Sequence, residues 1–331
     1  FADGKFTSSD GKARLVAVVP PASEPVDRAL PLRLNTGRFR DQWHTMTRTG
    51  LSPRLSQHRR EALVDIHPDD AAERAIYDGT LARIMTPQGN SIYRVQVTDA
   101  QRKGEMFVPM HWTDQMSSGG RANRLPDQTV DPVSGQPAYK NSPCNIEAVE
   151  SEWRAFLGSS KRPALPALLH WTSARIAGGW LTEMASEGNI DVDGLLPDGD
   201  RLEAVDMKRG MRRIAVRDSE GRLAAALFVT RNGQLPSREW IAAQLVSDEQ
   251  ADAPSLLAAR PKVAGPDKGA ILCVCFNVGV KQIVGAIAEQ SLTSLEDVGT
   301  ALNAGTNCGS CRPALAKLLA ETLEPKLEAA E

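Results

Sequence analysis

Residues 271–280 read ILCVCFNVGV and residues 306–315 read TNCGSCRPAL, and these two stretches determine the fold of the C-terminal part of the chain. They hold the pairs Cys273/Cys275 and Cys308/Cys311. Two thiolates from one short loop reach a common metal at little extra loop-closure cost. Five cysteines in a chain of 331 residues are too few for a disulfide framework. Four of the five belong to the two pairs, and this clustering predicts a metal site.

Between the two cysteine pairs the sequence predicts two helices. Apolar residues repeat at helical spacing in 280–288 and again in 294–302. Gly305 is expected to end the second helix, and Pro313 is expected in the first turn of a third. A metal cluster held by the four thiolates would be anionic. The positive end of that third helix and the charge of Arg312 would lie beside it, and both would stabilise its reduced form.

Four thiolates can hold zinc as well as an iron–sulfur cluster, or can remain unliganded. Zinc ribbons favour two C-x-x-C knuckles, so the C-x-C pair favours iron and sulfide, although zinc stays open. The stretch from Ile271 to Leu319 resembles the [2Fe-2S] domain of bacterioferritin-associated ferredoxin, in the fused form found in nitrite reductases and some assimilatory nitrate reductases. The resemblance implies a [2Fe-2S] cluster ligated by Cys273, Cys275, Cys308 and Cys311.

Residues 13–148 alternate short β-compatible runs with turn residues, a pattern that predicts a β-barrel. Gly, Pro, Asp or Asn bounds each run. One short helix is expected from Pro68 to Ile76. The runs are ARLVAVVP, PLRLNTG, ALVDIHP, TLARIMT, SIYRVQV and EMFVPMHW.

Seven arginines fall between residues 33 and 60, where Asp41 is the one acid. Such a run is most often a solvated face. Here the arginines flank the end of a predicted strand at Gly37, where the backbone can approach a ligand closely. The same stretch contains hydroxyl and cationic donors that suit a pyrophosphate. The sequence has no GxGxxG and no GKS/T, so neither a Rossmann loop nor a P-loop is supported. The donors are Thr36, Arg38, Gln42, His44, Thr45, Thr47 and Thr49.

The segments TGRFRDQWHTMTRTG, HPDDAA, DGTLARI, GEMFVPMHW and DPVSGQPAYK follow one another here. In this order they resemble the C-terminal molybdopterin-dinucleotide-binding domain of the molybdenum reductase family, most closely the assimilatory nitrate reductases. The resemblance spans residues 1–148, implies a double-psi β-barrel, and places Met110 near the substrate funnel. It implies cofactor contacts at Thr36, Gly37, Arg38, Gln42, His44, Thr45, Asn123 and Lys140.

Residues 149–262 are expected to form a small α+β unit that spaces and docks the cluster domain. A hairpin is expected at 212–230, and residues 247–268 read as a linker. The last domain, 263–331, therefore comprises the end of this linker and a helical [2Fe-2S] unit that starts at Gly269. Three helices are expected in the middle unit, at residues 152–157, 167–187 and 237–246.

Members of the resembled family hold a [4Fe-4S] cluster near the N-terminus and bind molybdenum through the middle of the chain. No cysteine precedes Cys144 here. We therefore expect the C-terminal part of a longer oxidoreductase that reduces nitrate to nitrite, inactive alone. It would share molybdenum-bis(molybdopterin guanine dinucleotide) with a preceding portion, to which the [4Fe-4S] cluster is assigned. The electron donor would be a flavoprotein reductase subunit, a ferredoxin or a flavodoxin.

The charge balance sets limits on partners. Lys and Arg number 39 against 41 Asp and Glu, so a net charge of −2 gives no overall attraction to nucleic acid or an anionic membrane. No apolar run approaches the ~20 residues needed to cross a bilayer, and a cytoplasmic protein is expected. Three alternatives stay open: a stand-alone [2Fe-2S] electron-transfer or iron-handling module, a nucleic-acid binder with a zinc knuckle, and a molybdenum oxidoreductase of different substrate.

The remaining candidate residues are predicted to have packing or surface roles. Cys144 is expected to be a small buried apolar residue. Four histidines have no ligand partner at helical or hairpin spacing, so packing or surface roles are expected for His58, His67, His111 and His170.

Overall fold

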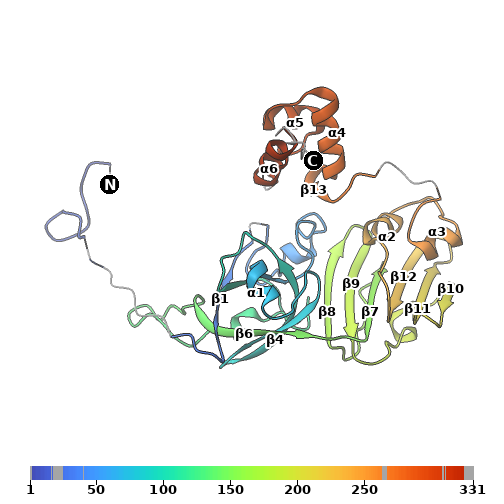
Figure 1. Cartoon of the computed structure of the whole chain (residues 1–331), viewed down its shortest axis with the longest axis horizontal. Coiled ribbons are helices and arrows are strands. Elements are labelled where there is room, and N and C mark those ends of the chain that lie inside the picture. Colours follow the sequence, from blue (N-terminus) through green and yellow to red (C-terminus); the bar gives the residue numbers. More distant parts are fainter. Residues whose placement is uncertain are drawn as a thin grey trace, which may run out of the picture.

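The computed structural model describes residues 2–15, 17, 25–39, 41–262, 267–307, 309 and 311–323. Within these residues the chain forms a closed barrel, a second six-stranded sheet and a helical unit with a short hairpin (Figure 1). No described helix is long and apolar enough to cross a membrane.

The first part is a closed six-stranded barrel, as the sequence predicted. Its strand order is β1-β5-β2-β4-β3-β6, with β1 parallel to β5 and β2 parallel to β4. Buried and half-buried residues alternate along β1, so that its apolar face points into the core. The strands are β1 (Leu32–Gly37), β2 (Leu63–Ile66), β3 (Leu81–Thr86), β4 (Gly89–Val97), β5 (Glu105–Pro109) and β6 (Ser142–Val149).

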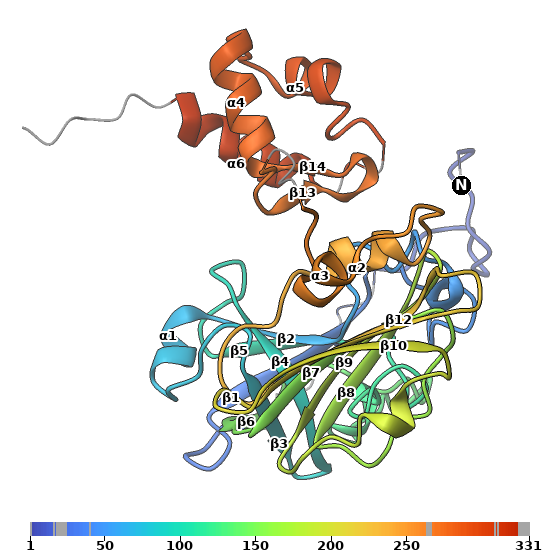
Figure 2. The same cartoon turned by 90° about the vertical axis from the view of Figure 1, so that its right-hand side faces the viewer.

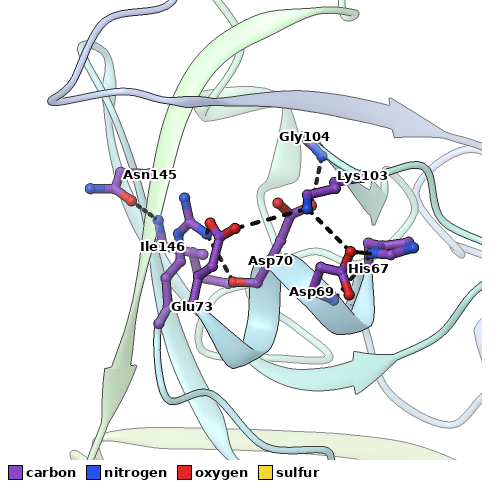
Figure 3. Close-up of polar contacts among 9 residues, drawn as sticks. His67, Asp69, Asp70, Glu73, Lys103, Gly104, Asn145 and Ile146 are labelled. Atoms are coloured by element: carbon purple, nitrogen blue, oxygen red, sulfur yellow. Dashed lines mark hydrogen bonds and ion pairs between the residues drawn. The ribbon is translucent and has the colours of Figure 1, made fainter.

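Helix α1 (Pro68–Ala72) follows β2 and is shorter than expected, since the chain leaves the helix at Glu73. Asp70 on this helix is buried, and its carboxylate accepts a hydrogen bond of 2.6 Å from the backbone N–H of Gly104 (Figure 3). This bond ties α1 to the loop that leads into β5. His67 caps the helix, since its Nδ1 accepts a hydrogen bond of 3.1 Å from Asp69 N–H.

Asp70→Ala is expected to destabilise the barrel by about 2 kcal/mol, because the half-buried Gly104 N–H loses its charged acceptor. The apparent Tm in thermal unfolding of the chain should fall by roughly 4–8 °C. The neighbouring Asp69→Ala is the matched control, because Asp69 pairs with Lys103 at the surface. Equal losses of stability in the two variants would refute this role for Asp70.

The second sheet is antiparallel throughout, with strand order β10-β11-β12-β7-β9-β8. Of the elements expected here, the hairpin is confirmed as β11 and β12, and the helix near 237–246 as α2 (Arg238–Gln244). The helices expected at 152–157 and 167–187 are wrong. The strands are β7 (Trp153–Ser159), β8 (His170–Ile176), β9 (Gly179–Ser186), β10 (Asp200–Asp206), β11 (Met211–Arg217) and β12 (Leu223–Thr230).

The error has a physical cause, since both faces of this sheet are covered. In β7, Ala155 and Leu157 belong to one core, while Phe156 belongs to the core on the other face. Such a strand has no polar face and shows no apolar–polar alternation. Its continuous apolar run therefore reads like a buried helix.

The predicted linker at 247–268 contains a helix, α3 (Ala253–Ala258). Asp252 caps it by accepting from Ser255 N–H at 2.7 Å. Leu256 of α3 and Ile241 of α2 share one core against the sheet, and Figure 2 shows both helices between the sheet and the helical unit. The linker is thus shorter than the sequence suggested.

The barrel and the second sheet are joined along β8. Ser117 forms a β-bridge with Thr172, and Ser173 N–H donates to Met116 O at 2.8 Å. Ser118 N–H donates to Trp171 O at 2.9 Å, so the barrel's own chain covers this strand edge. Figure 1 shows β8 as the strand nearest the barrel.

The C-terminal unit contains the three helices that the sequence predicted. Its hairpin, β13 (Ile271–Cys273) and β14 (Val278–Gly279), encloses the 3-10 turn Val274–Phe276. The second helix ends on Asn303 in the left-handed conformation (φ 58°), not on Gly305, because asparagine tolerates that conformation. The helices are α4 (Val280–Gln290), α5 (Leu295–Leu302) and α6 (Arg312–Leu323).

Candidate dinucleotide cradle and cluster site

We call residues 36–45, which continue from the end of β1, the cradle segment; Arg40 lies outside the described residues. Thr36 is buried, and its backbone N–H and hydroxyl both donate to Tyr139 O, at 3.2 and 3.0 Å. These bonds hold the end of β1 against the loop that carries Lys140. Two parts of the predicted site, about a hundred residues apart in sequence, therefore meet.

Gly37 allows a close approach at this point. A Cβ on Gly37 would lie 2.6 Å from Phe107 Cε2 and 3.7 Å from Lys140 Nζ. Met110 also contacts this residue, since its backbone N–H donates to Gly37 O at 2.9 Å. Desolvation lowers the pKa of Lys140 below its usual value, as for a cation that has lost part of its water. Met110 and Lys140 thus both lie next to Gly37.

Gln42 is held deep in the cradle segment. Its Nε2 donates to Leu55 O at 3.2 Å, while its Oε1 is buried without a hydrogen-bond partner among the described residues. A buried amide oxygen is costly to leave unpaired. An N–H or O–H of a purine or ribose would supply the missing donor.

Three further predicted contacts in the cradle segment are exposed at the surface. Arg38, His44 and Thr45 are exposed, and none of the three side chains has a hydrogen bond to another described residue. Trp43, 60% exposed, lies edge-on to the His44 ring at 4.4 Å. A guanidinium, an imidazole and a hydroxyl are therefore available to an anionic ligand.

Asn123 is the predicted contact that the structure does not join to the others. It is exposed on the 3-10 turn Ala122–Arg124, and no contact among the described residues links it to the cradle segment.

His111, expected to be a packing or surface residue, contacts the cradle segment directly. Its Nε2 lies 2.8 Å from Phe39 N and its Nδ1 lies 2.7 Å from His44 O. Sequence reasoning missed this residue, because a single histidine after β5 carries no spacing signal.

The cysteines of the helical unit gather around one core. Cys273 at the end of β13 and Cys311 at the start of α6 are buried in it, and Cys275 packs against it. Cys308 lies outside the described residues, and among those described no three His, Cys, Asp or Glu side chains form a metal site. The three described thiols, gathered from two chain segments, fit a cluster that takes thiolate ligands. The complete ligand set stays a prediction.

Arg312 forms an ion pair with the neighbouring helix. Its Nη2 donates to Glu296 Oε1 at 2.8 Å, and this bond holds the pKa of Glu296 below its usual value. The charge that was expected to act on the cluster is therefore partly neutralised by α5.

Glu296→Gln is expected to raise the potential of the cluster by at most a few tens of millivolts, because an unpaired Arg312 favours the reduced state and exposed charges are screened. A redox titration at low ionic strength measures the shift, which should shrink as salt is added. Glu321→Gln, near the far end of α6, is the control and should change nothing. A lowered potential in Glu296→Gln would be the contrary result.

Comparison with known proteins agrees with this division of the chain. Residues 32–143 match the molydopterin dinucleotide binding domain, and residues 271–321 match the BFD-like [2Fe-2S] binding domain. The first match covers β1 to β5 and the start of β6, and the second covers the hairpin and most of the three helices. The chain thus carries a domain for each of the two predicted cofactors.

Curated relatives include a nitrate reductase from Klebsiella oxytoca, 37% identical over 320 residues, which are 95% of this chain and 37% of the relative. A nitrate reductase from Shewanella frigidimarina is 33% identical over 45% of this chain and 18% of its own length. A putative formate dehydrogenase from Staphylococcus aureus is 28% identical over 44% of this chain and 15% of its own length. The chain therefore spans little more than a third of the longest-matching of these relatives.

Proposed function

We propose that this chain, which carries a molydopterin dinucleotide binding domain followed by a BFD-like [2Fe-2S] binding domain, is the C-terminal part of a molybdenum-dependent assimilatory nitrate reductase. One observation carries the proposal: the 37% identity to a nitrate reductase runs through 95% of the chain. The similarity therefore extends over the parts of this chain that form the barrel, the second sheet and the helical unit.

In this proposal the barrel is of the double-psi type and binds the dinucleotide part of molybdenum-bis(molybdopterin guanine dinucleotide). When bound, the molybdenum cofactor supplies the oxygen-atom transfer that turns nitrate into nitrite. Arg38 and Lys140 provide positive charge for a pyrophosphate, and Gln42 offers its unpaired oxygen to a purine or ribose donor. Thr36 and Gly37 set the backbone, His44 and Thr45 add polar contacts, and Asn123 and Met110 keep the roles the resemblance implied.

The helical unit is proposed to hold the [2Fe-2S] cluster on Cys273, Cys275, Cys308 and Cys311. The domain limits proposed are 1–148, 149–262 and 263–331, with the middle domain positioning the last. A pocket of about 460 Å³ supports this role, since the barrel residue Arg60, helix α2 and the hairpin residue Ile271 all line it. Electrons would come from a flavoprotein reductase subunit, a ferredoxin or a flavodoxin, in the cytoplasm.

The test assays the full-length protein in two ways: with nitrate and a chemically reduced donor dye, and with formate and an oxidised acceptor dye. Nitrite formation from nitrate, with iron, sulfide and molybdenum in the purified protein, is the expected result. The formate dehydrogenase likeness makes formate oxidation the second candidate activity. Oxidation of formate without reduction of nitrate would replace the proposed substrate, and protein with zinc but no iron would overturn the cluster.

A further inference from the structure

The His111 side chain contacts the backbone of two residues in the cradle segment. The side chain is completely buried, just after β5. Its Nε2 lies 2.8 Å from the backbone nitrogen of Phe39, and its Nδ1 lies 2.7 Å from the backbone oxygen of His44. The imidazole therefore closes a six-residue loop, from Phe39 to His44, across its own ring.

The two partners fix the protonation state of the ring. A backbone N–H can only donate, so Nε2 of His111 must accept from Phe39. A backbone carbonyl can only accept, so Nδ1 must carry the proton that it donates to His44. The neutral Nδ1–H tautomer is the one form that makes both bonds.

The surroundings keep His111 neutral. Burial is the largest influence and lowers its pKa. The bond to the His44 carbonyl opposes this by raising the pKa, while the charges of Arg38 and His44 lower it further. A second proton on the ring would remove the acceptor of the Phe39 N–H.

The end of the loop needs such support because its backbone is unusual. His44, the last loop residue, has φ +31°, and Met46, two residues beyond it, has φ +60°; non-glycine residues rarely adopt such values. The Phe39 ring provides the other anchor, with the Arg59 guanidinium 4.5 Å from its centroid and the Phe107 ring at 5.9 Å. Ring packing at Phe39 and the two His111 bonds therefore hold both ends of the loop.

We propose that His111 is a positioning residue of the dinucleotide site: through its two backbone bonds it sets the loop that presents Arg38, His44 and Thr45 to the cofactor. The inference rests on the proposed function, since it assumes that the cradle segment binds the dinucleotide. His111 itself is fully buried, so it would act on the ligand through the loop and not by direct contact.

His170 provides a matched control. It is also buried, at 1% exposure, but it lies on β8 of the second sheet. Its Nε2 has no hydrogen-bond partner among the described residues, and its Nδ1 lies 3.5 Å from Ser118 Oγ. Replacing it disturbs packing without touching the cradle segment.

The experiment compares His111→Leu with His170→Leu in the full-length protein. Guanine nucleotide released by acid hydrolysis measures the cofactor retained, and thermal unfolding measures stability. His111→Leu should retain at least tenfold less dinucleotide, because two bonds to the loop are lost. His170→Leu should retain the wild-type amount of dinucleotide, even where its Tm is lower than that of the wild type. His111→Asn, which can replace Nδ1, and His111→Gln, which can replace Nε2, should each recover part of the binding.

A second measurement does not depend on the cofactor. The five histidines of the chain can be labelled with 15N, and His111→Leu identifies the His111 signals. Their shifts should show a protonated Nδ1 and an unprotonated Nε2, and the opposite tautomer would overturn the inference.

The outcomes separate the two proposals. Wild-type protein that holds the dinucleotide, with full retention in His111→Leu, would refute the role of His111 alone. Loss of the dinucleotide in His111→Leu and His170→Leu in proportion to their loss of stability would also refute it. Wild-type protein without a dinucleotide would overturn the proposed function, and the inference with it.

Discussion

Cys311→Ser is expected to remove almost all iron and acid-labile sulfide from the protein. Cys311 is buried at the start of α6 and shares a core with Cys273, so no other described thiol can take its place without repacking that core. A serine hydroxyl is a hard and weakly acidic ligand, whereas iron–sulfur clusters select thiolates. Because the cluster is bound by the folded unit alone, its loss should also lower the stability of the helical unit. Iron and sulfide analysis and visible absorption measure the effect.

Cys144→Ala is the control for this change. Cys144 is completely buried in the barrel core, and burial raises the pKa of its thiol to about 12, so it remains protonated. Its removal should leave the iron content unchanged. Full iron in Cys311→Ser, or an equal loss of iron in Cys144→Ala, would contradict the assignment of the ligands.

Gly37→Val is expected to lower dinucleotide retention by tenfold to a hundredfold, which corresponds to an overpacking cost of roughly 1–3 kcal/mol. The Cβ alone would meet Phe107 Cε2 at 2.6 Å. Phe107 cannot move away freely, because its ring packs against Phe39 of the cradle segment. The valine methyl groups would also crowd the Lys140 ammonium. Guanine released from purified full-length protein measures the loss.

Gly188→Val provides the comparison, since a Cβ at Gly188 meets no atom within 4 Å. It should leave both stability and cofactor content near the wild-type values. Gly37→Ala should lie between the two. Normal dinucleotide content in Gly37→Val would mean that cofactor binding does not depend on the absence of a side chain at Gly37.

The barrel was predictable where strands have one buried face and clear turn residues. Five of the six barrel strands fall on predicted runs, each of which Gly, Pro, Asp or Asn bounds. The first expected strand, at ARLVAVVP, is wrong for residues 13–15 and 17, and the rest of that run lies outside the described residues. Strand β6 was missed, because Pro143 interrupts its pattern, although it lies at the strand start where proline is tolerated.

The strands β7, β8 and β9 of the second sheet could not be recognised from local pattern, although the β11–β12 hairpin was predicted. Phe156 and Leu157 in β7 are adjacent in sequence, yet each is buried in a different core on an opposite face. A polar side chain at either position would have produced the alternation that identifies a strand.

The candidate site shows a similar limit. Close cysteine pairs carry a spacing signal, and their gathering around one core follows it. The meeting of Thr36 with the loop of Lys140 depends on barrel closure, which no local pattern encodes; the resemblance alone predicted it. His111 was missed because its two partners are backbone groups, and these leave no trace in the sequence.

The most direct test of the account follows the electron paramagnetic resonance signal of the reduced [2Fe-2S] cluster in the full-length protein after nitrate is added without any other oxidant. If barrel and helical unit serve one nitrate reductase, the signal disappears as nitrite forms, with two electrons consumed for each nitrate. A signal that persists in the presence of nitrate, in protein that contains both iron and molybdenum, would contradict the account.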